Sequence, residues 1–277
     1  MAKAIGLIGN FKGKVGNMVG YQIPDSNTGN TQGIRIYQPV VKNPKTSAQA
    51  EQRAKLAPIN ATYRALKSII DRGNEGLPYG NKSRLAWLKG AFNATNMPWI
   101  EKGKPVAYPV GCQLTKGSLA SLNYVVGTDV IEINATGVTT ETSVATIGAV
   151  STALKAAYPF LKDGDQITIV QGGVMAGTMG FNVFSFVIDT TSVVATTLFS
   201  AEAGRINYEG ANGGEAGAII VSREGESGQH LRSNESLGID PLLAADAPYN
   251  TTSKTAAVQS YMASASGSTD WAEESIQ

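Results

Sequence analysis

Five glycines and two lysines share the stretch GLIGNFKGKVGNMVG, residues 6–20, a composition that could hold a phosphate group. A P-loop needs four residues between its first glycine and the Gly-Lys pair, and then Ser or Thr to reach magnesium. Here only three residues separate Gly9 from Gly13 and Lys14, and Val15 stands where the hydroxyl is needed. No G-x-G step opens a dinucleotide fingerprint either. Two interpretations remain: turns that glycine permits between short strands, or backbone packed closely against a partner.

Side chains for catalysis are scarce. The chain has one histidine, His230, and one cysteine, Cys112, so a zinc site built from the usual ligands is not expected. Neither a G-x-S-x-G elbow nor an H-E-x-x-H pattern occurs. Asp163 and Asp165 flank Gly164, but they lack the oxygen ladder and closing glutamate of a calcium loop, so a tight turn is expected. Carboxylate pairs for glycoside hydrolysis stay open, because their spacing is spatial, and nothing singles out a pair. We predict no enzyme activity, no cofactor and no metal site.

Charge is divided along the chain. Through Lys104 the sequence holds 16 Lys and Arg against five Asp and Glu, a net charge of +11. The remainder holds seven against 17, a net charge of −10, so the total of +1 conceals the division. Such a division indicates nucleic-acid contact, or subunits whose two ends attract each other in neighbouring copies. Solvated charge without any partner is the third interpretation.

Elements that must position these groups can be predicted from pattern. Strands are expected at 19–23 and 34–37, joined by the polar turn 25–33. Two helices should follow, at 46–72 and 82–92.

The longer helix carries its own start and stop signals. Thr46 and Gln49 form a capping box, and Gly73 follows the last turn. Pro58 lacks a donor and should kink or split the helix. An apolar stripe at helical spacing marks the buried side: Leu56, Ile59, Tyr63, Leu66 and Ile70. Three basic residues project from a different face: Arg53, Arg64 and Lys67.

Strands dominate after Lys104. Runs of β-prone residues occur at 130–133, 167–170, 181–188 and 218–221, with one helix expected at 143–158. We therefore predict an α+β fold in three parts. A basic module of short strands and helices covers 1–104, an acidic antiparallel β sandwich or barrel covers 105–246, and a Ser-, Thr- and Ala-rich arm covers 247–277.

Three segments together resemble a family of uncharacterised proteins that is common in Bacteroidota genomes and their phages, including crAss-like gut phages. They are GKVGNMVGYQ, GIRIYQPVVKNPKTSAQAEQRAKL and the weaker AGAIIVSREGESGQHLRS. The resemblance covers mainly residues 6–72. It implies a virion structural role and offers no catalytic residues. It would make the following positions structural or interface residues: Gly13, Gly16, Arg35, Asn43, Pro44, Gln49, Gln52 and Arg53.

The first functional hypothesis is a non-enzymatic structural component of a bacteriophage virion, in the capsid or tail, that forms a homo-oligomer and contacts other virion proteins. The alternative is a nucleic-acid-binding protein packaged with the phage genome, and a carbohydrate-active or adhesive β protein is the third. The candidate interface or nucleic-acid residues are Lys12, Lys14, Arg35, Lys42, Lys45, Arg53, Arg64 and Lys67. Lys12 and Lys14 are expected to point at an acidic neighbour while the glycines let two strands pack closely.

Localisation is expected to be the virion, after synthesis in the cytoplasm of the host bacterium. No stretch of the sequence resembles a signal peptide or reaches transmembrane length. Membrane contact and a small-molecule substrate are therefore not expected.

Overall fold

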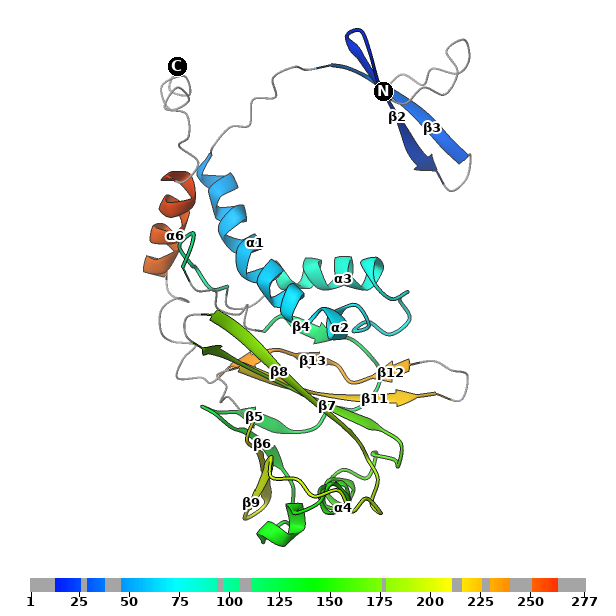
Figure 1. Cartoon of the computed structure of the whole chain (residues 1–277), viewed down its shortest axis with the longest axis vertical. Coiled ribbons are helices and arrows are strands. Elements are labelled where there is room, and N and C mark those ends of the chain that lie inside the picture. The colour runs from blue at the N-terminus through cyan, green and yellow to red at the C-terminus, as the bar shows by residue number, and fades with distance from the viewer. Residues whose placement is uncertain are drawn as a thin grey trace. The chain divides into compact units, whose positions relative to one another are not determined.

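The computed structural model describes residues 13–25, 29–37, 46–93, 97–104, 111–175, 178–210, 216–225, 230–239 and 251–263. The fold is α+β, with several antiparallel sheets (Figure 1). The chain divides into an N-terminal unit, Met1–Pro44, and a main unit, Lys45–Gln277. The division therefore lies at Pro44 and not at residue 104, where the charge changes sign. The reason is that helices from the basic half share a hydrophobic core with strands from the acidic half.

The described residues of the N-terminal unit form an antiparallel sheet with the strand order β1-β2-β3. Its strands are β1 (Gly13–Val15), β2 (Met18–Asp25) and β3 (Gly29–Ile36). The predicted hairpin is thus confirmed, with longer strands than expected.

Two glycines of this sheet have left-handed backbone angles. Gly16, with φ of +57°, and Asn17 form the two-residue turn between β1 and β2. Gly13 has φ of +123°. A Cβ built on either glycine would meet nothing within 4 Å, so backbone angle, not close packing within the chain, demands glycine here. Of the two interpretations of the glycine-rich stretch, these described residues adopt the turn.

Four helices of the main unit lie on one side of it: α1 (Ser47–Ala65), α2 (Lys67–Ile70), α3 (Asn81–Ala91) and α6 (Thr251–Ala263) (Figure 1). Thr46 caps α1, because the Gln49 N–H donates to Thr46 Oγ1 over 3.3 Å. The return bond of a capping box is missing, since Gln49 Oε1 has no partner among the described residues.

Helix α1 continues through Pro58, so of the two predicted outcomes, a kink or a split, the split was wrong. Pro58 is buried, and tertiary packing outweighs the one backbone hydrogen bond that proline removes. The break comes at Leu66, whose φ of −108° and ψ of 23° separate α1 from α2. Gly73 follows as expected, but for a steric reason: a Cβ there would lie 2.4 Å from the Leu114 carbonyl oxygen.

Two sheets stack beneath these helices. The upper sheet has the order β12-β11-β7-β8, with β14 also paired to β11, and the lower one has the order β5-β6-β10-β9. The upper strands are β12 (His230–Arg232), β11 (Ala216–Glu224), β7 (Gln166–Met175), β8 (Thr178–Val187) and β14 (Gly238–Ile239). The lower strands are β5 (Tyr124–Val126), β6 (Ile131–Asn134), β10 (Arg205–Tyr208) and β9 (Phe199–Glu202). A short pair, β4 (Gln113–Thr115) with β13 (Glu235–Ser236), joins the helices to the upper sheet.

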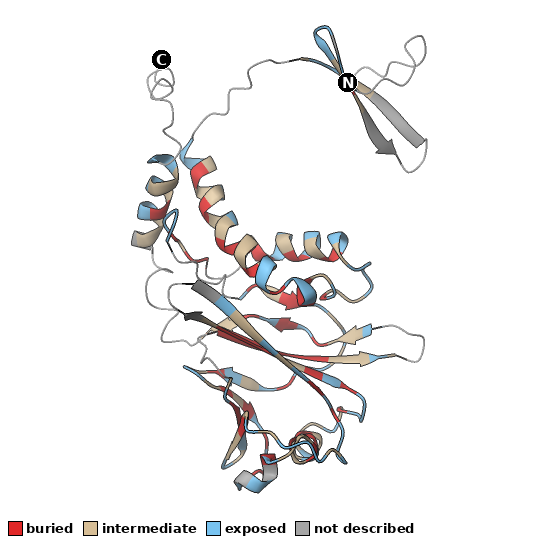
Figure 2. Cartoon of the chain, in the orientation of Figure 1, coloured by how far each residue is buried: buried red, intermediate tan, exposed pale blue. Residues whose placement is uncertain are grey.

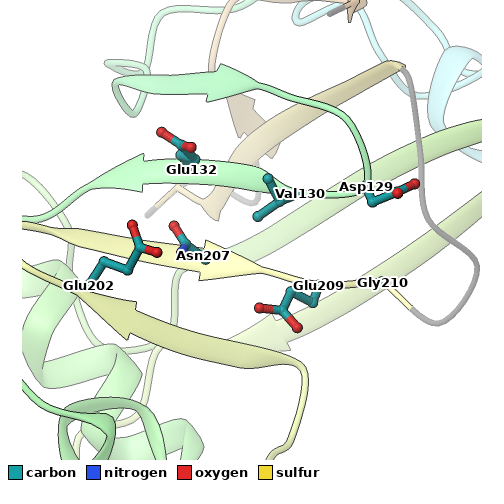
Figure 3. Close-up of a pocket in the computed structure, with 7 residues that line it drawn as sticks. All are labelled: Asp129, Val130, Glu132, Glu202, Asn207, Glu209 and Gly210. Carbon is teal, nitrogen blue, oxygen red and sulfur yellow. The ribbon is translucent and has the colours of Figure 1, made fainter.

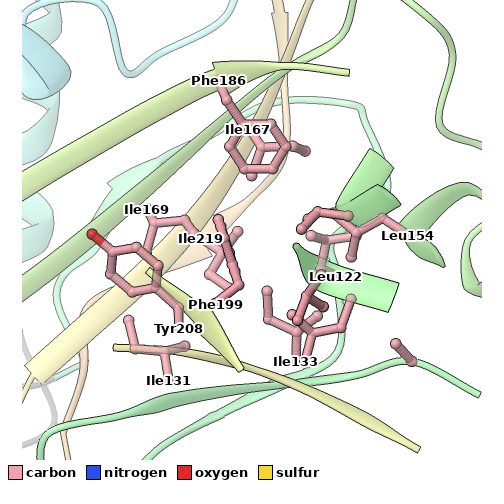
Figure 4. Close-up of a cluster of buried hydrophobic side chains, with 14 of the residues drawn as sticks. Leu122, Ile131, Ile133, Leu154, Ile167, Ile169, Phe186, Phe199, Tyr208 and Ile219 are labelled. Carbon is pink, nitrogen blue, oxygen red and sulfur yellow. The ribbon is translucent and has the colours of Figure 1, made fainter. Parts of the chain in front are cut away.

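Strand β11 of the upper sheet is buried on both faces over most of its length (Figure 2). Along β11, Ala218 and Ile220 pack into the core formed with the helices. Ile219 and Val221, which alternate with them, pack into the core of the lower sheet (Figure 4). The two sheets thus form a sandwich, with helices on one side of the upper sheet and the lower sheet on the other.

Helix α4 (Ile147–Ala157) closes the lower core, preceded by the 3-10 turn η1 (Glu141–Val144). The predicted helix at 143–158 therefore begins later, where Thr146 Oγ1 accepts from the Ala149 N–H over 3.1 Å. None of the described helices is both long enough and apolar enough to span a membrane.

The predicted arm at 247–277 contains α6, which lies beside α1 (Figure 1). Ala257 is buried at this contact. The Ser260 hydroxyl also accepts from the Lys102 N–H over 3.0 Å. This part of the arm is therefore a packed helix of the main unit.

Candidate functional site

The structure places two predicted basic residues on one face of the N-terminal sheet. Lys14 on β1 pairs with Val19 on β2, which pairs with Arg35 on β3. Tyr21 lies on the same face, where its ring covers Gly33. These four side chains, Lys14, Val19, Tyr21 and Arg35, are called the cationic face. The Lys14 ammonium lies 3.6 Å from the centroid of the Tyr37 ring, a cation–π contact.

The opposite face of this sheet is apolar. Met18 pairs with Ile36, and Gly20 pairs with Ile34. Met18 is 42% exposed and Ile36 is 77% exposed. The sheet thus presents cations on one side and hydrophobic side chains on the other.

The remaining predicted candidates do not form a cluster. Arg53 and Arg64 lie three turns apart on α1, about 16 Å along its axis at 1.5 Å per residue. Lys67 lies beyond the break, on α2. Gln49 and Gln52 lie near the start of α1. Five other predicted positions fall outside the described residues: Lys12, Lys42, Asn43, Pro44 and Lys45.

Two other lysines, Lys55 and Lys254, form ion pairs within the main unit. The carboxylate of Glu51 lies 3.1 Å from Lys55 Nζ and 3.2 Å from Lys254 Nζ. Hydrogen bonds from these two lysines lower the pKa of Glu51. Both ammonium groups also lie over the Trp99 ring, at 5.5 and 5.0 Å from its centroid. This group joins α6 to α1.

A hollow of about 570 Å³ lies on the outer face of the lower sheet. Figure 3 shows its lining, which comes from β6, β9, β10 and the loops at their ends: Asp129, Val130, Glu132, Glu202, Asn207, Glu209 and Gly210. These residues are called the acidic pocket. Strand alternation positions them: Ile206 and Tyr208 point into the core, so Asn207 points outward. Asn207 pairs with Glu132 on one side and with Ser200 on the other.

The acidic pocket carries uncompensated negative charge. Glu132 forms an ion pair with Arg205, with 2.6 Å between Oε2 and the guanidinium. Among the described residues, Glu209 accepts a hydrogen bond only from a neutral group, the Ser200 hydroxyl, over 2.7 Å. Of the four carboxylates that line the pocket, only that of Glu132 has an ion-pair partner, so three negative charges have no counter-ion among the described residues.

The pocket also holds a buried acceptor without a donor. Asn207 is 7% exposed, and its Oδ1 accepts no hydrogen bond from any described residue. Figure 3 shows its side chain between Glu132 and Glu202. Buried Gln171 donates to the Asp129 carbonyl over 3.1 Å, while its Oε1 is likewise unpaired in the described structure. Unpaired buried acceptors are uncommon in folded proteins, so this site is suited to a ligand that donates hydrogen bonds.

The cysteine and the histidine that were considered for catalysis lie outside the acidic pocket. Cys112 is buried, and burial raises the pKa of its thiol to about 12, far above that of a reactive thiolate. His230 is exposed, with its ring centroid 5.9 Å from that of Tyr79. Within the described residues, no group of three His, Cys, Asp or Glu side chains is placed to hold a metal ion.

Sequence reasoning missed the acidic pocket. The signal that exists is alternation: Glu132 between Ile131 and Ile133 marks an outward position on an amphipathic strand. Alternation does not reveal that β6 pairs with β10, which follows it by about 70 residues. No protein-family model, curated protein or solved structure matches this chain.

Proposed function

We propose that this protein is a non-enzymatic structural subunit that assembles in multiple copies, as a component of a bacteriophage virion. The observation that carries the proposal is the N-terminal sheet, a separate unit with an exposed apolar face. Three short strands need a covered hydrophobic face to be stable. Exposed apolar surface on such a sheet is typical of a protein–protein interface.

Sedimentation velocity of the full-length protein tests this proposal. We expect multimers whose proportion rises with protein concentration, and Ile36→Gln should reduce it. Val193→Gln is the matched control, because Val193 in the main unit is 88% exposed and Ile36 is 77% exposed. A wild-type protein that stays monomeric at every concentration and salt level would refute the proposal. Mass spectrometry of purified phage particles tests separately whether this protein is a component of the virion.

Nucleic-acid binding is the second candidate function, and a specific observation favours it. Arg53, Arg64 and Lys67 have no ion-pair partner among the described residues, unlike Lys55. Cations without an ion-pair partner on α1 and α2 are available to phosphate groups.

Replacing Arg53, Arg64 and Lys67 together with Gln tests this candidate. If they contact phosphate, binding to DNA or RNA should weaken and its salt dependence should fall by about one unit of slope per lost contact. A wild-type protein that does not bind nucleic acid at low salt would refute it, and the face would then be assigned to protein contacts.

A further inference from the structure

We propose that the acidic pocket binds the cationic face of the N-terminal sheet from a second copy of this chain. The inference rests on the proposed function, because it names one contact between copies, made by the face of the sheet opposite to its apolar face. It makes the pocket an acceptor for the ammonium of Lys14 and the guanidinium of Arg35.

The chemistry of the pocket selects the class of ligand. Three uncompensated carboxylate charges and the unpaired Asn207 Oδ1 all favour a positively charged hydrogen-bond donor. An anion or an apolar segment would leave these acceptors desolvated and unpaired. Ammonium and guanidinium groups carry several N–H donors each and accept no hydrogen bonds.

A metal ion fits less well than an organic cation. Ca²⁺ requires six to eight oxygen ligands around one point, at about 2.3–2.6 Å. The described carboxylates of the pocket are not grouped in this way. They are distributed over three strands and their loops, an arrangement suited to a partner with cations at more than one position.

The spacing of the cationic face is similar to that of two carboxylates of the pocket. Lys14 and Arg35 lie on strands that flank β2, so they are two strand spacings apart, about 10 Å. Glu132 and Glu202 lie on strands that flank β10, two spacings across the sheet. Asn207 pairs with Glu132 and with Ser200, so Glu202 is displaced by two residues along its strand and the two carboxylate-bearing positions are about 12 Å apart. Arg35 is exposed and makes no described ion pair, so its guanidinium is available to a partner.

Net charge indicates which surfaces would meet: the basic N-terminal unit of one copy and the acidic pocket of the next. Residues 1–44 contain five Lys and Arg against one acidic residue, Asp25. The contact is heterologous, since it joins one surface to a different one, and repetition generates rings or filaments. Opposite charge across such a contact accelerates association and makes it sensitive to salt.

Charge-reversal variants of the full-length protein test the pairing. The face variant is Lys14→Glu with Arg35→Glu, and the pocket variant is Glu202→Lys with Glu209→Lys. Each should weaken self-association about 100-fold, or ~2.8 kcal/mol. Glu101→Lys with Glu224→Lys is the charge-matched control, because both residues are exposed outside the pocket, and it should assemble like wild type.

Mixing the two variants identifies the partner. The face variant keeps an intact pocket and the pocket variant keeps an intact face, so an equimolar mixture should form dimers through one restored contact. Sedimentation velocity detects them. If each variant is monomeric and the mixture stays monomeric, the second copy is excluded as the occupant.

Failure of this inference is distinguishable from failure of the proposed function. A multimeric wild type whose pocket variant assembles equally well would overturn the inference alone. A wild type that is monomeric under all conditions would overturn both.

Discussion

Replacing Asp165 with Asn should remove a buried ion pair that ties the turn before β7 to β11. Asp165 is buried, and its Oδ1 and Oδ2 each lie 2.6 Å from a nitrogen of Arg223. Oδ2 also accepts from the Lys162 N–H over 2.8 Å. The hydrogen bond to Asp165 raises the pKa of Arg223. This bidentate geometry is the strong form of a carboxylate–guanidinium pair.

The size of the effect follows from burial. Removing one member of a buried ion pair costs about 3–5 kcal/mol, because the other charge stays buried without a partner. The Arg223 side chain is 20% exposed, so we expect the lower end, about 3 kcal/mol. For a unit the size of residues 45–277, each kcal/mol shifts the melting temperature by about 2–4 °C, so Asp165→Asn should lower it by roughly 6–12 °C.

Thermal unfolding followed by circular dichroism measures this shift, and the neighbouring aspartate supplies the control. Asp163 pairs with Lys155 at 2.8 Å, but its side chain is 60% exposed, so Asp163→Asn should change the melting temperature by no more than about 2 °C. The double variant Asp165→Leu with Arg223→Met should recover most of the loss, since no charge is left unpaired. An Asp165→Asn protein that melts within 2 °C of wild type would refute the reasoning.

Two further predictions follow from steric and electrostatic surroundings. Gly90→Ala in α3 should stabilise the protein by about 0.5–1 kcal/mol, because alanine is the better helix former and nothing lies within 4 Å of its Cβ. Gly148→Ala in α4 should instead destabilise it by about 1–3 kcal/mol, because the Cβ would lie 2.3 Å from the Ser192 carbonyl oxygen; equal effects in urea unfolding would contradict both. Burial raises the pKa of Glu235 above its ordinary 4.5, so wild-type stability should fall as the pH rises from that value toward the folded-state pKa. Glu235→Gln does not titrate, so the melting temperature of the variant minus that of wild type should become more positive between about pH 4 and pH 8; a constant difference would contradict the assignment.

Local signals predicted the elements well where local physics decides them. The helix expected at 82–92 is α3, Asn81–Ala91, and Thr46 caps α1 as its hydroxyl and position suggested. The run AIIV at 218–221 was recognised as a strand because β11 is buried on both faces, which makes its sequence continuously apolar. The turn at 162–165 is also confirmed, with φ of +92° at Gly164.

Long-range arrangement could not be predicted in the same way. Among the described hydrophobic side chains of helix α6, only Ala257 is buried. The sequence of this helix therefore has no apolar stripe from which its packing could be predicted. The acidic pocket depends on β6, β9 and β10 lying together, and strand pairing leaves no mark in the periodicity of any one strand. The sequence pattern places Asn207 on the outer face of its strand, but it does not show that neighbouring side chains bury it there.

The charge division along the sequence acquires a different meaning in three dimensions. Residues 46–104 are basic, yet their helices pack on the same sheet sandwich that carries the acidic pocket, so the charge boundary is not a domain boundary. Within the main unit, the helices and the lower sheet lie on opposite sides of the upper sheet (Figure 1). Opposite charges pair locally within the main unit, as in Asp165 with Arg223 and Glu51 with Lys55, whereas three carboxylates of the acidic pocket have no ion-pair partner among the described residues. Residues 1–44 form a separate unit with a net positive charge, so the contact that we propose would bring its cations to the acidic pocket of another copy.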